Sequence, residues 1–375
     1  MRSPLLSADT LLTQVRHLAT QELVPHAADI DRHARYPAEV LRTLASVGAW
    51  RTPLARALGG AGLGHTIPIA VGDALGAACG TTALLYWLRH ACIALLAEAP
   101  RATPREAWLA SVLDGTLAAG CAPADLLRLP GDEAESGLRA RPVQEAYRID
   151  GRLRGVLQAA PGHLLIATAG MAGNDGAPLC FAVRGDAAGL EIHPAESPTV
   201  LAGALPAEVV FKDVRIGPAG VLAAPEDGDD LAGRLRVPLL LAQLGFIFGV
   251  TEGCLRLMRA SPDTDELGSY QLDHEEILAV ALSSSRAKAR RLAAQADNGR
   301  AAFSDVLRLR AHAAQLVLRA ANAAVLHAGP AGLTAGHGAW LRLREAAYIG
   351  TAAPSIAQLR RELSGFDRRM KQVGT

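Results

Sequence analysis

Hydrophobic positions in the first part of the chain recur at the spacing of an α-helix. Leu11, Val15 and Leu18 lie three or four residues apart, so their side chains would share one helical face. A second periodic run begins after Pro37 and stops at Gly48. Proline favours the first turn of a helix and glycine the position after its last turn, so this run predicts a short helix between them.

A longer apolar stretch covers residues 67–96, and it is interrupted at Gly76 and Gly80. Apolar residues on all sides of a helix are typical of a segment buried in the protein core. The stretch therefore predicts core helices. Arg89 and His90 lie within it, and we interpret them as a polar edge of the helix rather than as ligands.

The hydrophobic period changes near residue 115. Short apolar runs such as 208–216 are separated by clusters of Gly, Pro, Asn and Asp, which is typical of strands in an antiparallel barrel or sandwich. From about residue 230 helical periodicity returns, in segments long enough for a four-helix bundle. These segments lie near 231–260, 272–299, 303–328 and 338–363. The predicted fold is α+β, with an N-terminal helical domain (1–114), a central antiparallel β-barrel (115–225) and a C-terminal four-helix bundle (226–375).

Composition and charge narrow the possible partners. Hydrophobic residues make up 50% of the chain and charged residues 20%, as in a globular protein with a large core. A formal net charge of +1 gives no field that would attract nucleic acid or an anionic membrane, and neither partner is expected. The five cysteines are scattered, without zinc-ligand spacing, so no metal site is predicted. We expect a cytoplasmic protein, because the start of the chain lacks the pattern of a signal peptide.

Several local motifs, taken in order, are similar to those of one family. Residues 209–218 (VVFKDVRIGP) resemble an F-x-D-V-R-V-P strand, and residues 151–154 (GRLR) resemble the start of a G-x-K-x-W-x-T hairpin. Residues 327–334 and 344–346 are similar to G-G-x-G-Y and R-D-A segments. Over most of its length the chain thus resembles the acyl-CoA dehydrogenase superfamily. The resemblance implies a flavin oxidoreductase that holds FAD and a CoA- or carrier-bound acyl group between its domains.

The resemblance also locates the base that removes the substrate α-proton, which in the family is a glutamate. Counting without a gap from the R-D-A segment places Ala353 at that position, whereas alignment to the Tyr-Glu-Gly-Thr motif places Ile349 there. The family's other arrangement places Leu235 there, just before Arg236. None of the three is a carboxylate. Glu345 is the remaining candidate near this loop, although in the family that acid usually serves structure.

Positions that would contact FAD have also changed. By the resemblance they are Cys121, Ala122, Gly155, Leu157, Thr264, Gly268 and Gly329. The first four replace residues beside the isoalloxazine, where the family offers hydroxyl and amide groups. Thr264 replaces an arginine that meets the diphosphate, and Gly329 is where a neighbouring subunit's adenosine would lie. Because each missing polar contact weakens binding, we predict weak or absent flavin.

Three functions therefore stay open at the sequence level. The first is an acyl-CoA dehydrogenase-like flavin oxidoreductase with an unidentified base. The second is a flavin-dependent monooxygenase of the same superfamily, which needs no α-proton base. The third is a flavin-free protein with a non-redox catalytic role or the role of a partner subunit. We expect a homodimer or homotetramer formed through the bundle, with a hetero-oligomer as the alternative, since apolar residues at 239–241 and 320–325 cover wide arcs.

Overall fold

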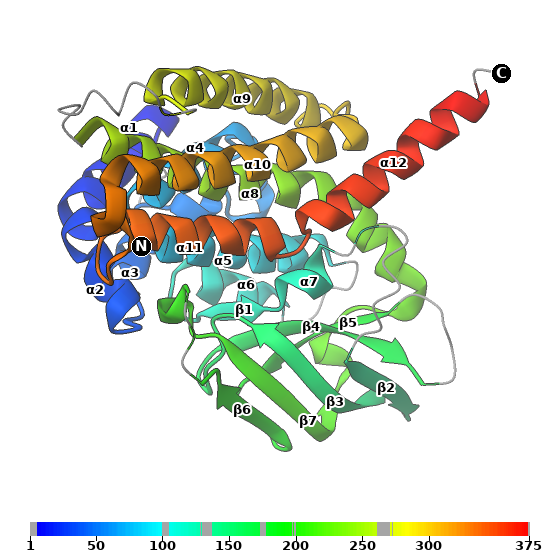
Figure 1. The fold of residues 1–375 in the computed structure, drawn as a ribbon. Helices are drawn as coiled ribbons and strands as arrows, with labels where there is room; N and C mark the ends of the chain where they lie inside the picture. Colours follow the sequence, from blue (N-terminus) through cyan, green and yellow to red (C-terminus); the bar gives the residue numbers. More distant parts are fainter. Residues whose placement is uncertain are drawn as a thin grey trace.

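The computed structural model describes residues 6–99, 105–127, 129, 137–172, 178–196, 198, 200–260, 271 and 273–373. Figure 1 shows two layers: the helices gather in one, and a twisted sheet lies below them. Chain order runs from helices to strands and back to helices, as the change of hydrophobic period predicted. The α+β fold is confirmed.

Short helices begin the chain. They are α1 (Ala8–Leu18), α2 (Ala27–Arg32) and α3 (Ala38–Ser46). The hydroxyl of Ser7 accepts a hydrogen bond from the backbone N–H of Thr10 and so caps α1. Pro37 is the N-cap of α3, and Gly48 follows this helix in the left-handed conformation with φ 78°. The predicted Pro-to-Gly helix is confirmed.

The long apolar stretch forms α4 (Thr66–Ala78) and α5 (Gly80–Glu98), and α6 (Arg105–Leu113) follows. In α5, Arg89 is 3% exposed and His90 is 2% exposed. The interpretation of this pair as a polar edge was wrong. The apolar pattern placed the helix in the core correctly but did not reveal that the core also surrounds these two side chains.

The middle of the chain forms a sheet, with the short helix α7 (Pro123–Leu126) after its first strand. The strands are β1 (Ala119–Cys121), β2 (Leu138–Val143), β3 (Ala146–Val156), β4 (Leu164–Met171), β5 (Leu179–Arg184), β6 (Leu190–Pro194), β7 (Ala207–Ile216) and β8 (Val221–Ala223). Their order is β6-β7-β3-β2-β4-β5-β8, and β1 pairs with β4. The ring of Phe181 on β5 meets that of Phe211 on β7 edge to face at 6.0 Å, so the sheet folds around its own apolar core.

The sheet is not wholly antiparallel, which corrects the predicted antiparallel barrel. Strand β4 runs parallel to both β1 and β2. Alternation of polar and apolar residues has the same period in parallel and antiparallel strands, so the sequence pattern could not distinguish them. The other pairings among the described strands are antiparallel.

The C-terminal helices are α8 (Pro225–Ala260), α9 (Glu275–Ala296), α10 (Phe303–Ala328), α11 (Gly338–Thr351) and α12 (Ile356–Val373). Where one helix was expected over 338–363, the chain forms two. Figure 1 shows α12 extending beyond the rest of the molecule. Residues 231–260 of α8 are long and apolar enough to span a membrane, but 83% of their apolar window is buried in the protein, as in a core helix.

Helices α4 and α8 meet at glycines. A Cβ atom placed on Gly249 would lie 2.6 Å from the Cα of Gly76 and 2.5 Å from the carbonyl oxygen of Asp73. Backbones can approach this closely only where side chains are absent. One apolar cluster runs continuously through the N-terminal helices and the bundle.

Candidate functional site

The two alignments for the family's base point to different structural positions near the end of α11. Residues 352–355 form this loop, whereas Ile349 lies inside α11 and is 2% exposed. Ala353, the position given by counting without a gap, is the one of these two that lies in the loop. Ser355 is committed elsewhere: its hydroxyl accepts from the N–H of Gln358 at 3.3 Å, and the Gln358 side chain accepts from the N–H of Ser355 at 2.8 Å. This capping box begins α12 and leaves no side chain in the loop suited to be a base.

The buried side chain of Arg310 supports the loop through Gln243. The Nε of Arg310, on α10, donates to Oε1 of Gln243 at 2.7 Å, and Gln243 Nε2 donates to the carbonyl of Ala353 at 3.3 Å. Arg310 also reaches the carbonyl of Ile349 at 3.4 Å, in the last turn of α11. A cation there is favourable because unpaired carbonyls give a helix C-terminus partial negative charge. Burial nevertheless lowers the pKa of Arg310 to about 9, since no carboxylate faces it among the described residues.

Glu345 is paired with residues outside this loop. It is 1% exposed, and its Oε2 accepts a hydrogen bond from Arg342 at 2.7 Å. Its Oε1 accepts from the backbone N–H of Gly80 at 3.0 Å. Arg342 in turn donates to the carbonyls of Gly76, Ala77 and Ala78 at the end of α4. The carboxylate thus joins α11 to the junction of α4 and α5, and this geometry makes it a structural ion pair.

Three of the four positions expected beside the isoalloxazine come together. The N–H of Leu157 donates to the carbonyl of Cys121 at 3.0 Å, and Ala122 follows directly. Cys121 is fully buried, Ala122 is 2% exposed and Leu157 is 5% exposed. Gly155 differs, because it is exposed and has nothing within 4 Å of where a Cβ would lie. Sequence reasoning missed Tyr348 on α11 as a neighbour of this site. Burial is the main cause that raises the pKa of Tyr348, and the nearby Cys121 thiol raises it further.

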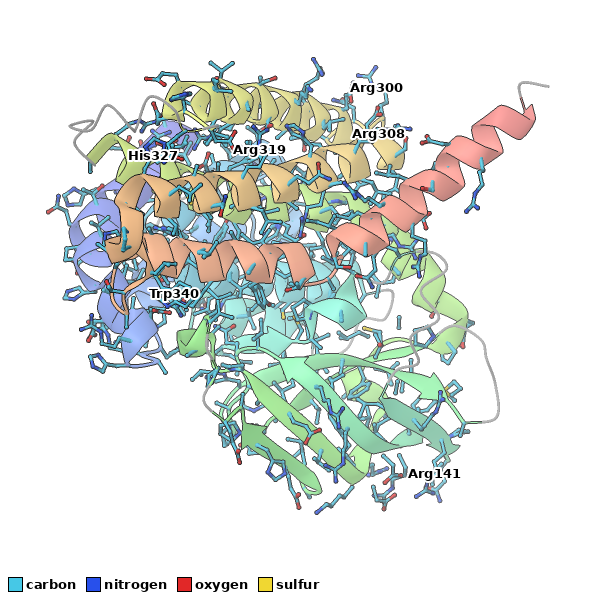
Figure 2. All side chains as sticks on the ribbon, viewed as in Figure 1. Arg141, Arg300, Arg308, Arg319, His327 and Trp340 are labelled. Atoms are coloured by element: carbon cyan, nitrogen blue, oxygen red, sulfur yellow. The ribbon has the colours of Figure 1, made fainter. Side chains whose placement is uncertain are left out.

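Gly329 lies elsewhere. It ends α10, 19 residues after Arg310, which is about 28 Å along the helix axis at 1.5 Å per residue. Figure 2 shows this end of α10 at His327, far from Arg308, which lies toward α12. Thr264 and Gly268, expected at the diphosphate, lie outside the described residues.

These residues do not fit FAD in the way that the resemblance implies. Around the predicted isoalloxazine position the side chains of Cys121, Ala122 and Leu157 are apolar or weakly polar and buried in the protein core. None of them offers a hydroxyl or an amide. Among the described residues, no group of three or more His, Cys, Asp or Glu side chains could hold a metal ion.

Comparison with known proteins gives matches to acyl-CoA dehydrogenases. The family model described as "Acyl-CoA dehydrogenase, N-terminal domain" matches residues 7–116. A probable acyl-CoA dehydrogenase of Bacillus subtilis, YngJ, is 27% identical over 223 residues, which cover 57% of this chain and 57% of that protein. The matched region thus spans little more than half of that relative. By these matches the chain is similar to the acyl-CoA dehydrogenases.

Solved structures share the fold over nearly the whole chain. A glutaryl-CoA dehydrogenase in complex with glutaryl-CoA superposes with a TM-score of 0.84 at 18% identity, covering 98% of this chain and 96% of that one. FMN-bound TdsC from Paenibacillus sp. A11-2 gives a TM-score of 0.82 at 15% identity and covers 95% and 96%. At these identities the likeness establishes the fold alone.

Proposed function

We propose that this chain serves acyl-thioester oxidoreduction as a partner subunit: it binds a CoA- or carrier-bound acyl group but supplies neither the α-proton base nor the polar contacts to flavin. The observation that supports the proposal is the loop between α11 and α12, where Ala353 lies at one of the positions expected for the base and no residue of 352–355 is a carboxylate. Ser355 is engaged in capping α12, and Glu345 is paired with Arg342.

Dehydrogenation next to a thioester requires that a base accept the α-proton while a hydride leaves the adjacent carbon. A methyl side chain at residue 353 cannot accept that proton. In this chain the residues around the loop hold its shape, through Arg310 and Gln243. The fold and its acyl-binding role are kept in this proposal, and the redox step belongs to a partner subunit.

A second candidate is that the chain itself is a flavin oxidoreductase of acyl thioesters with an unidentified base. The match to the family's N-terminal model and the nearly complete overlap with its solved structures favour it. An FMN-bound neighbour in the same fold supports the related alternative of a flavin-dependent monooxygenase, since oxygen activation needs no α-proton base.

Absorbance and turnover of the purified protein separate these candidates. Under the first proposal the protein lacks a stoichiometric flavin band in the visible, binds an acyl-CoA in a calorimeter and does not desaturate it with an electron acceptor. One FAD per chain together with robust desaturation contradicts the proposal and supports the second candidate. Oxygen consumption with added reduced flavin would instead indicate a monooxygenase.

A further inference from the structure

A buried polar cluster surrounds Arg89 between the N-terminal helices and the sheet. The guanidinium carbon of Arg89 lies 4.5 Å from the centre of the Trp50 ring, a cation–π contact. Trp50 is itself fixed, because its Nε1 donates to the carbonyl of Tyr86 at 3.3 Å. The Tyr86 hydroxyl donates to the carbonyl of Ala49 at 3.2 Å. The aromatic wall on one side of Arg89 is therefore rigid.

Tyr36, Gln158 and His163 lie on the other side of the cluster. Gln158 is fully buried, and its Nε2 donates to the Tyr36 hydroxyl oxygen at 2.7 Å. His163 contacts Gln158 as well, because its Nδ1 donates to the carbonyl of Gln158 at 2.8 Å.

 The contact between His163 and Gln158 is a single hydrogen bond from the imidazole ring to the backbone carbonyl. A carbonyl can only accept, so the proton of neutral His163 is on Nδ1.

Several polar atoms of the cluster have no partner. Nε of Arg89, Oε1 of Gln158 and Nδ1 of His90 are buried without a hydrogen bond. Buried polar atoms are usually paired, and an unpaired group marks a place where a ligand or a water would be stabilised. The Tyr36 hydroxyl accepts from Gln158, so its own proton is available to an acceptor.

The charge of Arg89 has no acidic counterpart among the described residues. Burial lowers the pKa of Arg89, and its described electrostatic partners are Tyr36 and Cys92, neither of which is a carboxylate. Buried Arg342 is different, because it pairs with Glu345 and three carbonyls. A buried cation without a counter-ion is costly, and an anion that enters the cluster removes that cost.

A cavity of about 940 Å³ lies on the outer side of this cluster. It opens between α1, α2 and α3, and Tyr36 forms part of its wall together with Ile30 and Val47. Tyr36 thus borders both the cavity and the buried cluster.

We propose that the cluster is a carboxylate-binding site, in which Arg89 binds the carboxylate through its free Nε edge and Tyr36 donates its hydroxyl proton to it. A carboxylate matches the planar fork of a guanidinium and accepts two parallel hydrogen bonds. The carboxylate belongs either to a free organic acid or to the far end of an acyl thioester. Only the second source rests on the proposed function.

Binding of three compounds by calorimetry tests this site: glutarate, glutaryl-CoA and butyryl-CoA. If glutarate is the only one of the three compounds that binds, the carboxylate of the natural ligand belongs to a free organic acid. Glutaryl-CoA that binds at least about tenfold more tightly than butyryl-CoA, about 1.4 kcal/mol, identifies an acyl-borne carboxylate. If neither glutarate nor the carboxylate of glutaryl-CoA contributes to binding, the proposal is wrong. Failure of butyryl-CoA alone contradicts the proposed function and leaves the carboxylate site standing.

Variants locate the site. Arg89→Gln should weaken carboxylate binding at least about tenfold while the free protein unfolds at an equal or higher temperature, because an uncompensated charge has been removed. Tyr36→Phe should weaken binding to a smaller extent. Arg35→Gln is the matched control, since Arg35 lines the same cavity but pairs with Asp29 at its surface, and binding should stay unchanged. Equal losses in the Arg35 and Arg89 variants, or full binding by Arg89→Gln, would overturn the assignment.

Discussion

Buried arginines in this protein have very different surroundings. Arg342 pairs with a carboxylate, Arg310 caps the last turn of a helix, and Arg89 lies against an aromatic ring. The sequence pattern predicts the helix that carries each of them. It could not predict their partners, because those come from segments distant in the chain, such as Gln243 for Arg310.

Glu345→Gln should destabilise the protein by about 3–5 kcal/mol, because it leaves Arg342 buried without its counter-charge. Urea unfolding measures this loss. Glu39→Gln is the control: its side chain is 89% exposed and only 3.9 Å from Arg42, so a change of about 0.5 kcal/mol or less is expected. Unaltered stability together with lost turnover would instead identify Glu345 as the base.

His90 should make the protein less stable in acid. Burial, followed by the nearby His65, lowers its pKa from 6.5 to about 4. Below about pH 6.5 the unfolded chain therefore binds a proton that the folded protein rejects, so stability falls as the pH is lowered toward 4. Between pH 7 and pH 5 this amounts to about 2 kcal/mol.

Urea unfolding of the wild type and His90→Leu at these two pH values checks the prediction. The wild type should lose about 2 kcal/mol more than the variant on going from pH 7 to pH 5. Between pH 7 and pH 8 the unfolding free energies of the two proteins should change in parallel, because the His90 imidazole is then neutral in both the folded and the unfolded wild type. An identical loss in acid would exclude this role for His90.

Helix ends are the elements that sequence signals predict best. Pro37 and Gly48 bracket α3, and the Ser355–Gln358 capping box begins α12. That capping box lies inside a segment expected to be one helix, so a sequence signal for the break was present and local. Strand direction had no comparable signal, since β1 and β2 become parallel to β4 only through tertiary pairing.

Arg310→Met should loosen the loop between α11 and α12 while changing overall stability by about 1 kcal/mol or less. Replacing a buried, uncompensated charge by an apolar side chain of similar size is often neutral. Two hydrogen bonds from the guanidinium are lost, so amide hydrogens at residues 350–356 should exchange about 10- to 100-fold faster. Hydrogen exchange measured by mass spectrometry tests this.

Arg308→Met is the matched control on the same helix. Arg308 pairs at the surface with Asp367 of α12 at 3.0 Å and makes no described contact with the loop. Exchange at 350–356 should stay at the wild-type rate in this variant. Equal rates in all three proteins would show that Arg310 does not position the loop.

At the scale of the whole molecule, the order of helical, sheet and helical parts followed from the hydrophobic period alone. The basis for expecting an oligomer needs revision, however. Residues 239–241 are at most 1% exposed and the apolar positions of 320–325 are buried too, so their wide apolar arcs are covered within the chain. The exposed apolar side chains of the bundle include Leu326 on α10, at 52%, and two neighbours on α9, Ile277 at 56% and Val280 at 70%.

Ile277 and Val280 are three residues apart and share one face of α9, which we predict to be covered by another subunit. Sedimentation of the wild type should show a homodimer or homotetramer, or a complex with a partner chain when one is co-expressed. The double variant Ile277→Lys, Val280→Glu should sediment as a monomer. Val143→Lys on β2 is the control and should leave the assembly intact. A monomeric wild type would contradict the prediction.

The glycine contact between α4 and α8 has a consequence for how this chain can diverge. Gly76 and Gly249 bring two backbones together, and one apolar core continues across that crossing. Cohesion of the helical parts therefore depends on small residues and hydrocarbon side chains rather than on polar groups that hold a ligand. Natural selection can replace those polar groups one by one without unfolding the protein. A single alanine at Gly249, by contrast, would force the helices apart, so mutational tolerance should be lowest where no chemistry takes place.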